Sequence, residues 1–162
     1  MRPLAALLLA LLLPLHALAA GLSGTWTLDK AASQDLTPLL AAEGAPAIER
    51  GIVSRMSVTQ VIDDAGDRIH LELQSVLRDK SMDLILDGVE RTEPGDHGPT
   101  QATHVRGPDG VVTSTIRFEA RVGAPAVLVI RREVQGDALR QQLTLTVEGQ
   151  PPVHALRVFR RG

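Results

Sequence analysis

The stretch LSGTWTLDKAASQDL, residues 22–36, joins a Gly-Thr-Trp triplet to a short alternating run and then to a cluster of small polar residues. It contains Trp26, the only tryptophan of the chain. The alternation over Thr25–Asp29 predicts a β-strand, and the polar cluster after it is typical of a helix start. The stretch therefore predicts a strand that is followed directly by a helix.

Two short helices are predicted between this strand and residue 56. Residue types that favour a helix N-cap precede the first of them, namely Ser33, Asp35 and Thr37. Gly44 can end this helix in a left-handed conformation, and Pro46 can open the second one. Ile48 and Ile52, with Val53 beside them, give the second helix an apolar stripe. We expect a marginal helix pair.

From residue 56 onward, short β-rich runs alternate with turn residues, which is the pattern of an all-β sandwich or barrel. Nine strands are predicted there, near residues 56–63, 68–77, 81–86, 88–93, 100–106, 111–119, 125–134, 138–148 and 153–160. The first strand makes ten, and the short connections force neighbouring strands to run antiparallel. The sequence EPGDHGP, residues 93–99, is predicted to be a linker. We therefore predict an all-β fold: a ten-stranded antiparallel up-and-down β-barrel without exposed sheet edges, with a short helix pair between its first two strands.

Residues 1–20, MRPLAALLLALLLPLHALAA, have the pattern of a cleaved secretory signal peptide, with one charge at Arg2, an apolar run and small residues at the end. The apolar run is shorter than the about 20 residues that span a bilayer. We expect cleavage near Ala20, no membrane span in the mature chain, and a periplasmic or secreted protein. The remaining residues, 21–162, have the size of one domain.

The composition of the mature chain excludes several classes of function. Without Arg2 it has 16 basic residues against 19 acidic ones, so no basic surplus favours nucleic acid as a partner. The chain has no cysteine, so its stability depends on packing and backbone hydrogen bonds rather than on disulfides. Only Trp26, Phe118 and Phe159 are aromatic, which argues against stacking platforms and predicts an aliphatic interior. The oligomeric state stays open.

The order of these elements resembles the calycin superfamily, and the fatty-acid-binding proteins more than the lipocalins proper. The chain also resembles exported bacterial lipocalin-like proteins that begin Gly-Thr-Trp-x-Leu-Asp/Asn with a Lys and a Ser shortly after. The matching residues are Gly24, Thr25, Trp26, Leu28, Asp29, Lys30 and Ser33. The resemblance implies a barrel that binds a small apolar or amphipathic molecule.

A second point of resemblance lies near the C-terminus. Fatty-acid-binding proteins commonly hold a ligand carboxylate with an Arg-x-Tyr pair on the last strand and with a further arginine earlier in the sequence. Arg157 matches the first arginine, and Arg132 matches the other by its place before a turn. Phe159 stands where the tyrosine is expected, which removes a hydroxyl donor. The resemblance implies that these three residues contact the ligand, with Ile52 and Val53 lining a two-helix lid.

The strand period gives independent information about the two arginines. In AVLVIRREV, Arg132 is in phase with Ile130 and Val134, so a regular strand places its side chain on an apolar face, with Arg131 on the other face. Both faces of the last strand are mixed, so the period does not decide the direction of Arg157.

An arginine inside a barrel has to meet a carboxylate, ordered water or a charged ligand, because an unpaired buried charge costs several kcal/mol. If Arg132 points inward, a wet cavity follows, and a small amphipathic ligand of the fatty-acid type is our leading hypothesis. Two alternatives stay open: both arginines extend along the surface of a well-filled barrel, and such a barrel is a structural or protein-interaction module of the cell envelope.

In the resembled families, the tryptophan of the first strand closes one end of the barrel and a basic side chain packs across its ring. The resemblance implies that role for Gly24 and Trp26, with Arg161 as the better candidate for the basic side chain and Arg160 as the second. This role is structural.

Catalytic and metal sites are not predicted. The histidines lack the spacing of a zinc site, and the chain has neither a Gly-x-Ser-x-Gly elbow nor a thiol nucleophile. The acidic stretch DDAGD, residues 63–67, lacks the length and the terminal glutamate of a calcium loop and is predicted to be a hairpin turn. We therefore expect a binding protein without a cofactor; an isomerase or hydrolase on a lipocalin-like barrel is a minor alternative.

Overall fold

The computed structural model describes residues 21–162. The signal peptide predicted at residues 1–20 lies outside them. The elements are, in order, β1 (Gly24–Leu28), α1 (Thr37–Glu43), α2 (Ala47–Arg55), β2 (Val58–Asp64), β3 (Arg68–Ser75), β4 (Lys80–Ile85), β5 (Arg91–Gly95), β6 (Gly98–Arg106), β7 (Val112–Glu119), β8 (Pro125–Gln135), β9 (Ala138–Val147) and β10 (Val153–Arg161). Neither helix of this part of the chain is long and apolar enough to cross a membrane.

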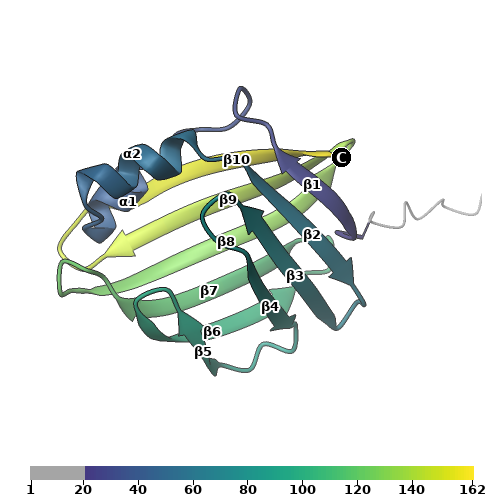
Figure 1. Ribbon diagram of the computed structural model, residues 1–162. Coiled ribbons are helices and arrows are strands. Elements are labelled where there is room, and N and C mark those ends of the chain that lie inside the picture. The colour runs from purple at the N-terminus through teal and green to yellow at the C-terminus, as the bar shows by residue number, and fades with distance from the viewer. Residues whose placement is uncertain (1–20) are drawn as a thin grey trace, which may run out of the picture.

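The ten strands form one curled antiparallel sheet in the order β4-β3-β2-β1-β10-β9-β8-β7-β6-β5. Figure 1 shows the sheet wrapping around its interior, with both helices at one end. The predicted strand number, the antiparallel order and the helix pair between β1 and β2 are confirmed. The predicted absence of sheet edges is wrong, because β4 and β5 each pair on one side only.

The connection between β4 and β5 explains why these two strands do not pair. The backbone N–H of Gly88 donates to the carbonyl of His104 on β6 (3.0 Å), and Asp87 bridges to Val105. The Asp87 carboxylate also accepts two hydrogen bonds of 2.7 Å from Arg91, which hold its pKa well below the usual range. The backbone of the connection is thus bonded to β6 through Asp87 and Gly88 and to the β2–β3 turn through Leu86, whose N–H donates to Asp67 (2.8 Å), and the sheet stays open between β4 and β5.

The stretch predicted to be a linker, residues 93–99, forms most of a tight hairpin between β5 and β6 instead. Pro94 pairs with Pro99 and Gly95 with Gly98. Two prolines favour a loop prediction because they donate no backbone hydrogen bond. An edge strand tolerates that loss, and the pairing of β6 with β7 begins only at Gln101.

The helix ends follow the predicted residues in part. Gly44 ends α1 with a φ of 100°, and Pro46 precedes α2. Asp35 accepts a hydrogen bond from the N–H of Thr37 (2.9 Å) at the start of α1. The expected capping role of Ser33 is wrong: its hydroxyl accepts a hydrogen bond of 2.9 Å from the N–H of Val158 and thereby ties the chain before α1 to β10.

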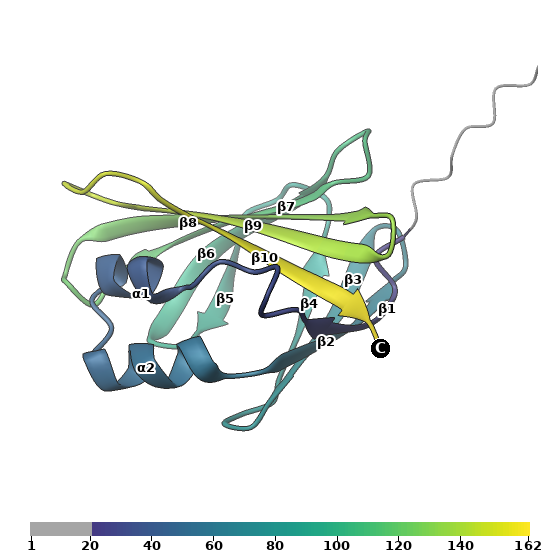
Figure 2. The same ribbon diagram turned by 90° about the horizontal axis from the view of Figure 1, so that it is seen from above.

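The two helices are held unequally. Figure 2 shows them side by side at one end of the sheet. Helix α1 packs against β9 and β10 and buries Leu39. Helix α2 buries none of its residues, and Ile48 on its surface is 80% exposed. The apolar stripe of α2 therefore does not pack into the core.

The interior has three layers. The closed-end cluster consists of the buried residues Leu22, Trp26, Ile62, Ile69, Leu71, Leu84, Val112, Leu139 and Phe159. The helix-end cluster consists of Leu39, Ala120, Ala126, Leu143, Leu145, Val147 and Ala155. The buried polar residues are Gln60, His104, Ser114, Arg132 and Gln141. Since Gln141 lies between Leu139 and Leu143 on the inward face of β9, a polar layer separates the two apolar clusters.

Trp26 lies fully buried in the closed-end cluster. Its indole N–H donates to the carbonyl of Leu22 (2.8 Å), and the Arg161 guanidinium lies 4.4 Å from the ring centroid. Gly24 lies directly beneath that guanidinium: a Cβ there would come within 2.7 Å of Arg161 Nη1, and its φ of 142° disfavours any side chain. The Gly-x-Trp motif thus places an arginine over the tryptophan.

Two glycine substitutions test this packing. We expect Gly24→Ala to destabilise the protein by about 1–3 kcal/mol, since the new methyl group strains the backbone and displaces Arg161. Gly51→Ala is the control: nothing lies within 4 Å of a Cβ on this helical glycine, so alanine should stabilise the protein by up to about 1 kcal/mol. Urea unfolding followed by Trp26 fluorescence measures both, and equal effects would contradict the role given to Gly24.

Candidate functional site

Arg132 lies on the concave face of β8. Its side chain is buried, with 5% of the residue exposed, while Arg131 is exposed, as the alternation along this strand predicts. Its Nη1 donates to the hydroxyl of Ser114 (3.2 Å), and its buried Nε has no partner among the described residues. Burial lowers the pKa of Arg132 to about 10. The guanidinium is thus charged at neutral pH, although no carboxylate within residues 21–162 is paired with it.

Arg157 lies on β10 and is half-buried. Its guanidinium lies 5.3 Å from the ring centroid of Phe159, which is fully buried. The phenyl ring that replaces the expected tyrosine therefore offers its face to the arginine and no hydroxyl. Burial lowers the pKa of Arg157. None of the ion pairs within residues 21–162 includes this side chain.

The two arginines belong to one row across the sheet. Gln141 on β9 is in register with Arg132 on one side and with Arg157 on the other. Two strand spacings separate the arginine backbones by about 10 Å. Gln60 reaches this row from β2: its Nε2 donates to Gln141 Oε1 (3.2 Å), while its own buried Oε1 has no partner in the described structure.

A third inward arginine, Arg106, differs from these two because it is paired with a carboxylate. Arg106, at the end of β6, forms an ion pair of 2.6 Å with Asp64, whose side chain is 4% exposed. Burial of Asp64 opposes its ionisation, but the Leu22 N–H and Arg106 stabilise the carboxylate and hold its pKa below the usual value. Arg106 is thus neutralised by a protein carboxylate, whereas Arg132 and Arg157 are not.

A hydrogen-bonded chain leads from Arg132 to the edge of the sheet. Ser114 Oγ lies 2.8 Å from His104 Nδ1, and His104 Nε2 lies 3.0 Å from Glu93 Oε1. A serine, a histidine and a carboxylate in sequence also occur in acyl-transfer triads. Here Ser114 is 1% exposed and its hydroxyl is shared with Arg132. We therefore infer that these hydrogen bonds hold the Arg132 side chain in place and do not activate Ser114 for nucleophilic attack.

Sequence reasoning missed Gln60, His104 and Ser114. The signal was present for the last two, since each is in phase with buried residues of its strand, Ala102 on β6 and Val112 on β7. Spacing along the sequence does not reveal these two residues, because the hydrogen-bond partners of His104 lie on the neighbouring strands. No group of three or more potential metal ligands occurs in residues 21–162.

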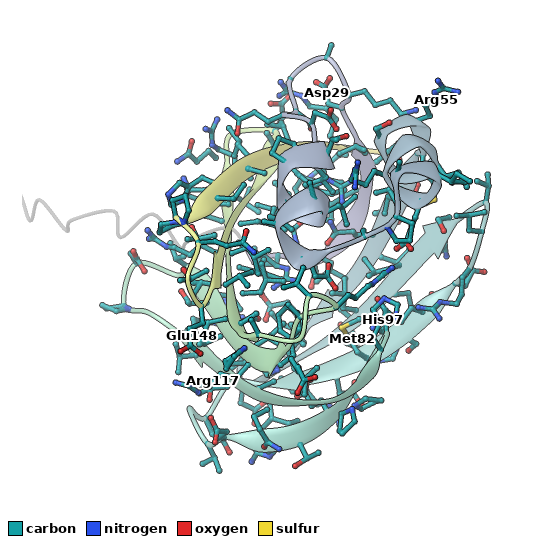
Figure 3. The ribbon with its side chains drawn as sticks, turned by 90° about the vertical axis from the view of Figure 1, so that its left-hand side faces the viewer. Asp29, Arg55, Met82, His97, Arg117 and Glu148 are labelled. Atoms are coloured by element: carbon teal, nitrogen blue, oxygen red, sulfur yellow. The ribbon has the colours of Figure 1, made fainter. Side chains whose placement is uncertain are left out.

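A pocket of about 220 Å³ opens above Arg157, between the helix pair and the sheet. Its apolar lining includes Leu28, Leu36, Val53 and Met56, and its polar lining includes Lys30 and Arg157. Figure 3 looks onto this end of the molecule, with Arg55 at the end of α2 and Asp29 in the connection before α1. Val53 and Arg157, both named from the sequence, thus line one pocket.

Ile52 lies elsewhere. It is 44% exposed and lines a shallow outer groove of about 420 Å³ with Ile48 and with Val76 of the β3–β4 turn. Of the predicted ligand-binding residues, Val53 and Arg157 therefore line one pocket and Phe159 contacts Arg157. Arg132 lies two strands away on the same row of the sheet, outside the lining of this pocket, and Ile52 lies on the outside.

The fold matches several solved structures of lipid-binding proteins. Lipid binding protein 8 of Caenorhabditis elegans superposes with a TM-score of 0.70 at 18% identity, over 86% of this chain and 94% of its own. The Schistosoma mansoni fatty acid binding protein in complex with arachidonic acid gives 0.69 at 23%, over 86% and 95%. Human cRBP IV gives 0.67 at 24%, over 88% and 99%.

These matches confirm the predicted resemblance in fold to the fatty-acid-binding proteins. No known sequence family and no curated protein matches the chain by sequence.

The buried charge of Arg132 is expected to lower the free energy of unfolding. We expect Arg132→Met to stabilise the protein by about 1–4 kcal/mol, because an apolar side chain of similar length removes the desolvation cost. Ser114 would keep its bond to His104. Arg131→Met on the exposed face is the matched control and should change stability by less than about 0.5 kcal/mol. The free energy of unfolding in urea measures both, and a loss of stability in Arg132→Met would refute the assigned cost.

Proposed function

We propose that the protein binds small amphipathic molecules with an anionic head group, such as fatty acids, inside the open end of its barrel. The observation that carries the proposal is the pair of inward guanidinium groups, Arg132 and Arg157, to which no carboxylate of the described chain is bonded. A ligand carboxylate would supply the missing charge, and charge-assisted hydrogen bonds to guanidinium groups are among the strongest that proteins make.

The pocket above Arg157 indicates how such a ligand would lie. Its head group would meet Arg157 first, with Lys30 at the rim, and its apolar part would contact Leu28, Leu36 and Val53. At about 220 Å³ the pocket is smaller than the about 300–1,000 Å³ of ordinary ligand sites. A long alkyl chain would therefore have to displace α2, which buries no residue and is the least anchored element here.

The expected affinity is moderate. Each buried methylene contributes about 0.8 kcal/mol, and association costs about 4–15 kcal/mol. With an association cost near the lower end of that range and charged hydrogen bonds of about 1.5–3 kcal/mol to one or both arginines, an acid of about ten carbons would bind in the micromolar range. The replacement of the expected tyrosine by Phe159 removes one hydrogen bond, worth about 0.5–1.5 kcal/mol.

A packed barrel that acts as a structural or protein-interaction module of the cell envelope is the second candidate. It is favoured by the two apolar clusters, which fill the closed end and the space beneath α1. The two candidates differ in one measurable property, the binding of a carboxylate ligand.

Binding should depend on the two inward arginines. Arg132→Gln and Arg157→Gln should each weaken the binding of decanoate by about 10- to 100-fold, the value of a charged hydrogen bond, and change the binding of decanol little. Arg131→Gln is the matched control. Displacement of a fluorescent fatty acid, with native mass spectrometry of the complex, measures this. A wild-type protein that binds no fatty acid up to its solubility limit would favour the packed module.

We also propose that the protein acts outside the cytoplasm, because residues 1–20 carry the pattern of a signal peptide. When the chain 1–162 is expressed in a Gram-negative bacterium, the protein recovered from the periplasm or the medium should have the mass of residues 21–162. Full-length protein confined to the cytoplasm would contradict this proposal.

A further inference from the structure

The chain of hydrogen bonds behind Arg132 ends on a carboxylate. Arg132 Nη1 donates to Ser114 Oγ, so the hydroxyl hydrogen of Ser114 is free to donate to His104 Nδ1. His104 then carries its proton on Nε2 and donates it to Glu93 Oε1. Every bond of the chain thus has a donor and an acceptor, with a cation at one end and a carboxylate at the other.

The four residues come from four neighbouring strands, β8, β7, β6 and β5, and three of them are buried. Arg132, Ser114 and His104 are 5%, 1% and 3% exposed. The Glu93 side chain is 27% exposed because β5 is an edge of the sheet. The polar chain therefore connects a fully buried charge to the opening between β4 and β5.

We propose that Glu93 is the remote counter-charge of Arg132. Its negative charge partly neutralises the guanidinium and repels the anionic head group of a ligand that binds there. The inference rests on the proposed function, because it concerns the anion site described above. Glu93 stabilises the empty barrel by partly offsetting the buried cation, and for the same reason it weakens the binding of a carboxylate. It is a positioning residue rather than one that contacts the ligand.

The other charged side chains around these four residues form ion pairs with different partners. On β5, Arg91 is bonded to Asp87, and on β6, Arg106 is bonded to Asp64. Across the opening, Lys80 of β4 is paired with Asp96. Ser114 is uncharged and is the inward residue of β7 that faces His104. Glu93 is therefore the carboxylate that the hydrogen bonds connect to Arg132.

The substitution Glu93→Gln tests the charge, because glutamine keeps an acceptor for His104 and nearly the same volume. A ligand carboxylate bound to Arg132 would lie three strand spacings, about 15 Å, from Glu93 on β5. Two unit charges at that distance, at an effective dielectric constant of about 20, change an affinity about sixfold. Glu93→Gln should therefore bind decanoate about sixfold more tightly than the wild type and bind decanol equally well. Glu90→Gln, which removes a surface carboxylate paired with Arg117, should change neither affinity. Unchanged or weaker decanoate binding in Glu93→Gln would overturn the proposal.

A double-mutant cycle tests the counter-charge without any ligand. Glu93→Gln should lower the urea midpoint of the wild type and lower it much less in the Arg132→Met background, where no buried cation remains. Equal shifts of the urea midpoint in both backgrounds would show that Glu93 is not the counter-charge of Arg132. If the wild type binds no decanoate, the proposed function fails, and the cycle alone then decides whether Glu93 compensates Arg132.

Discussion

The cost of burying positive charge inside a small barrel is the constraint on which the organisation of this protein depends. Arg132 and Arg157 lie on β8 and β10, on either side of β9, and burial lowers the pKa of both. A filled apolar core would exclude them. The interior instead keeps a polar layer between its two apolar clusters. There Arg132 donates to the Ser114 hydroxyl and Arg157 lies over the Phe159 ring, and no carboxylate of residues 21–162 is paired with either arginine. An unpaired charge that a fold retains at such a cost is a candidate for function.

The packing elsewhere in the sheet offsets the free-energy cost of this polar layer. The closed end is fixed by Trp26, by the guanidinium over its ring and by the glycine that makes room for it. The ion pair between Asp64 and Arg106 ties β2 to β6 at the same end. The helix end is held less firmly, because α1 buries Leu39 whereas α2 buries nothing. Firm packing thus lies away from the pocket, and the loosely held helix lies beside it.

The fold could be predicted because its signals are local. Alternation and turn residues located ten strands, Gly44 located the end of a helix, and alternation around Arg132 located the buried arginine. The open seam between β4 and β5 could not be predicted, because it depends on which distant backbone groups the connection around Asp87 meets. Ser33 was misassigned for the same reason: its partner on β10 lies 125 residues away. Gln60 and His104 were missed because a single polar residue in an alternating run becomes informative only when its neighbours across the sheet are known.

The position of Glu93 on an edge strand makes it more tolerant of substitution than the residues of the inner strands. A residue on β5 has a hydrogen-bonded neighbour strand on one side only, so its replacement disturbs one ladder rather than two. Arg132 and Gln141 lie between paired strands on both sides, where an exchange disturbs the packing of the interior. Under the proposed function, a single substitution at this edge would change the preference for charged or neutral ligands while the packing of the interior stays unchanged, so the charge of the site is adjustable independently of the core.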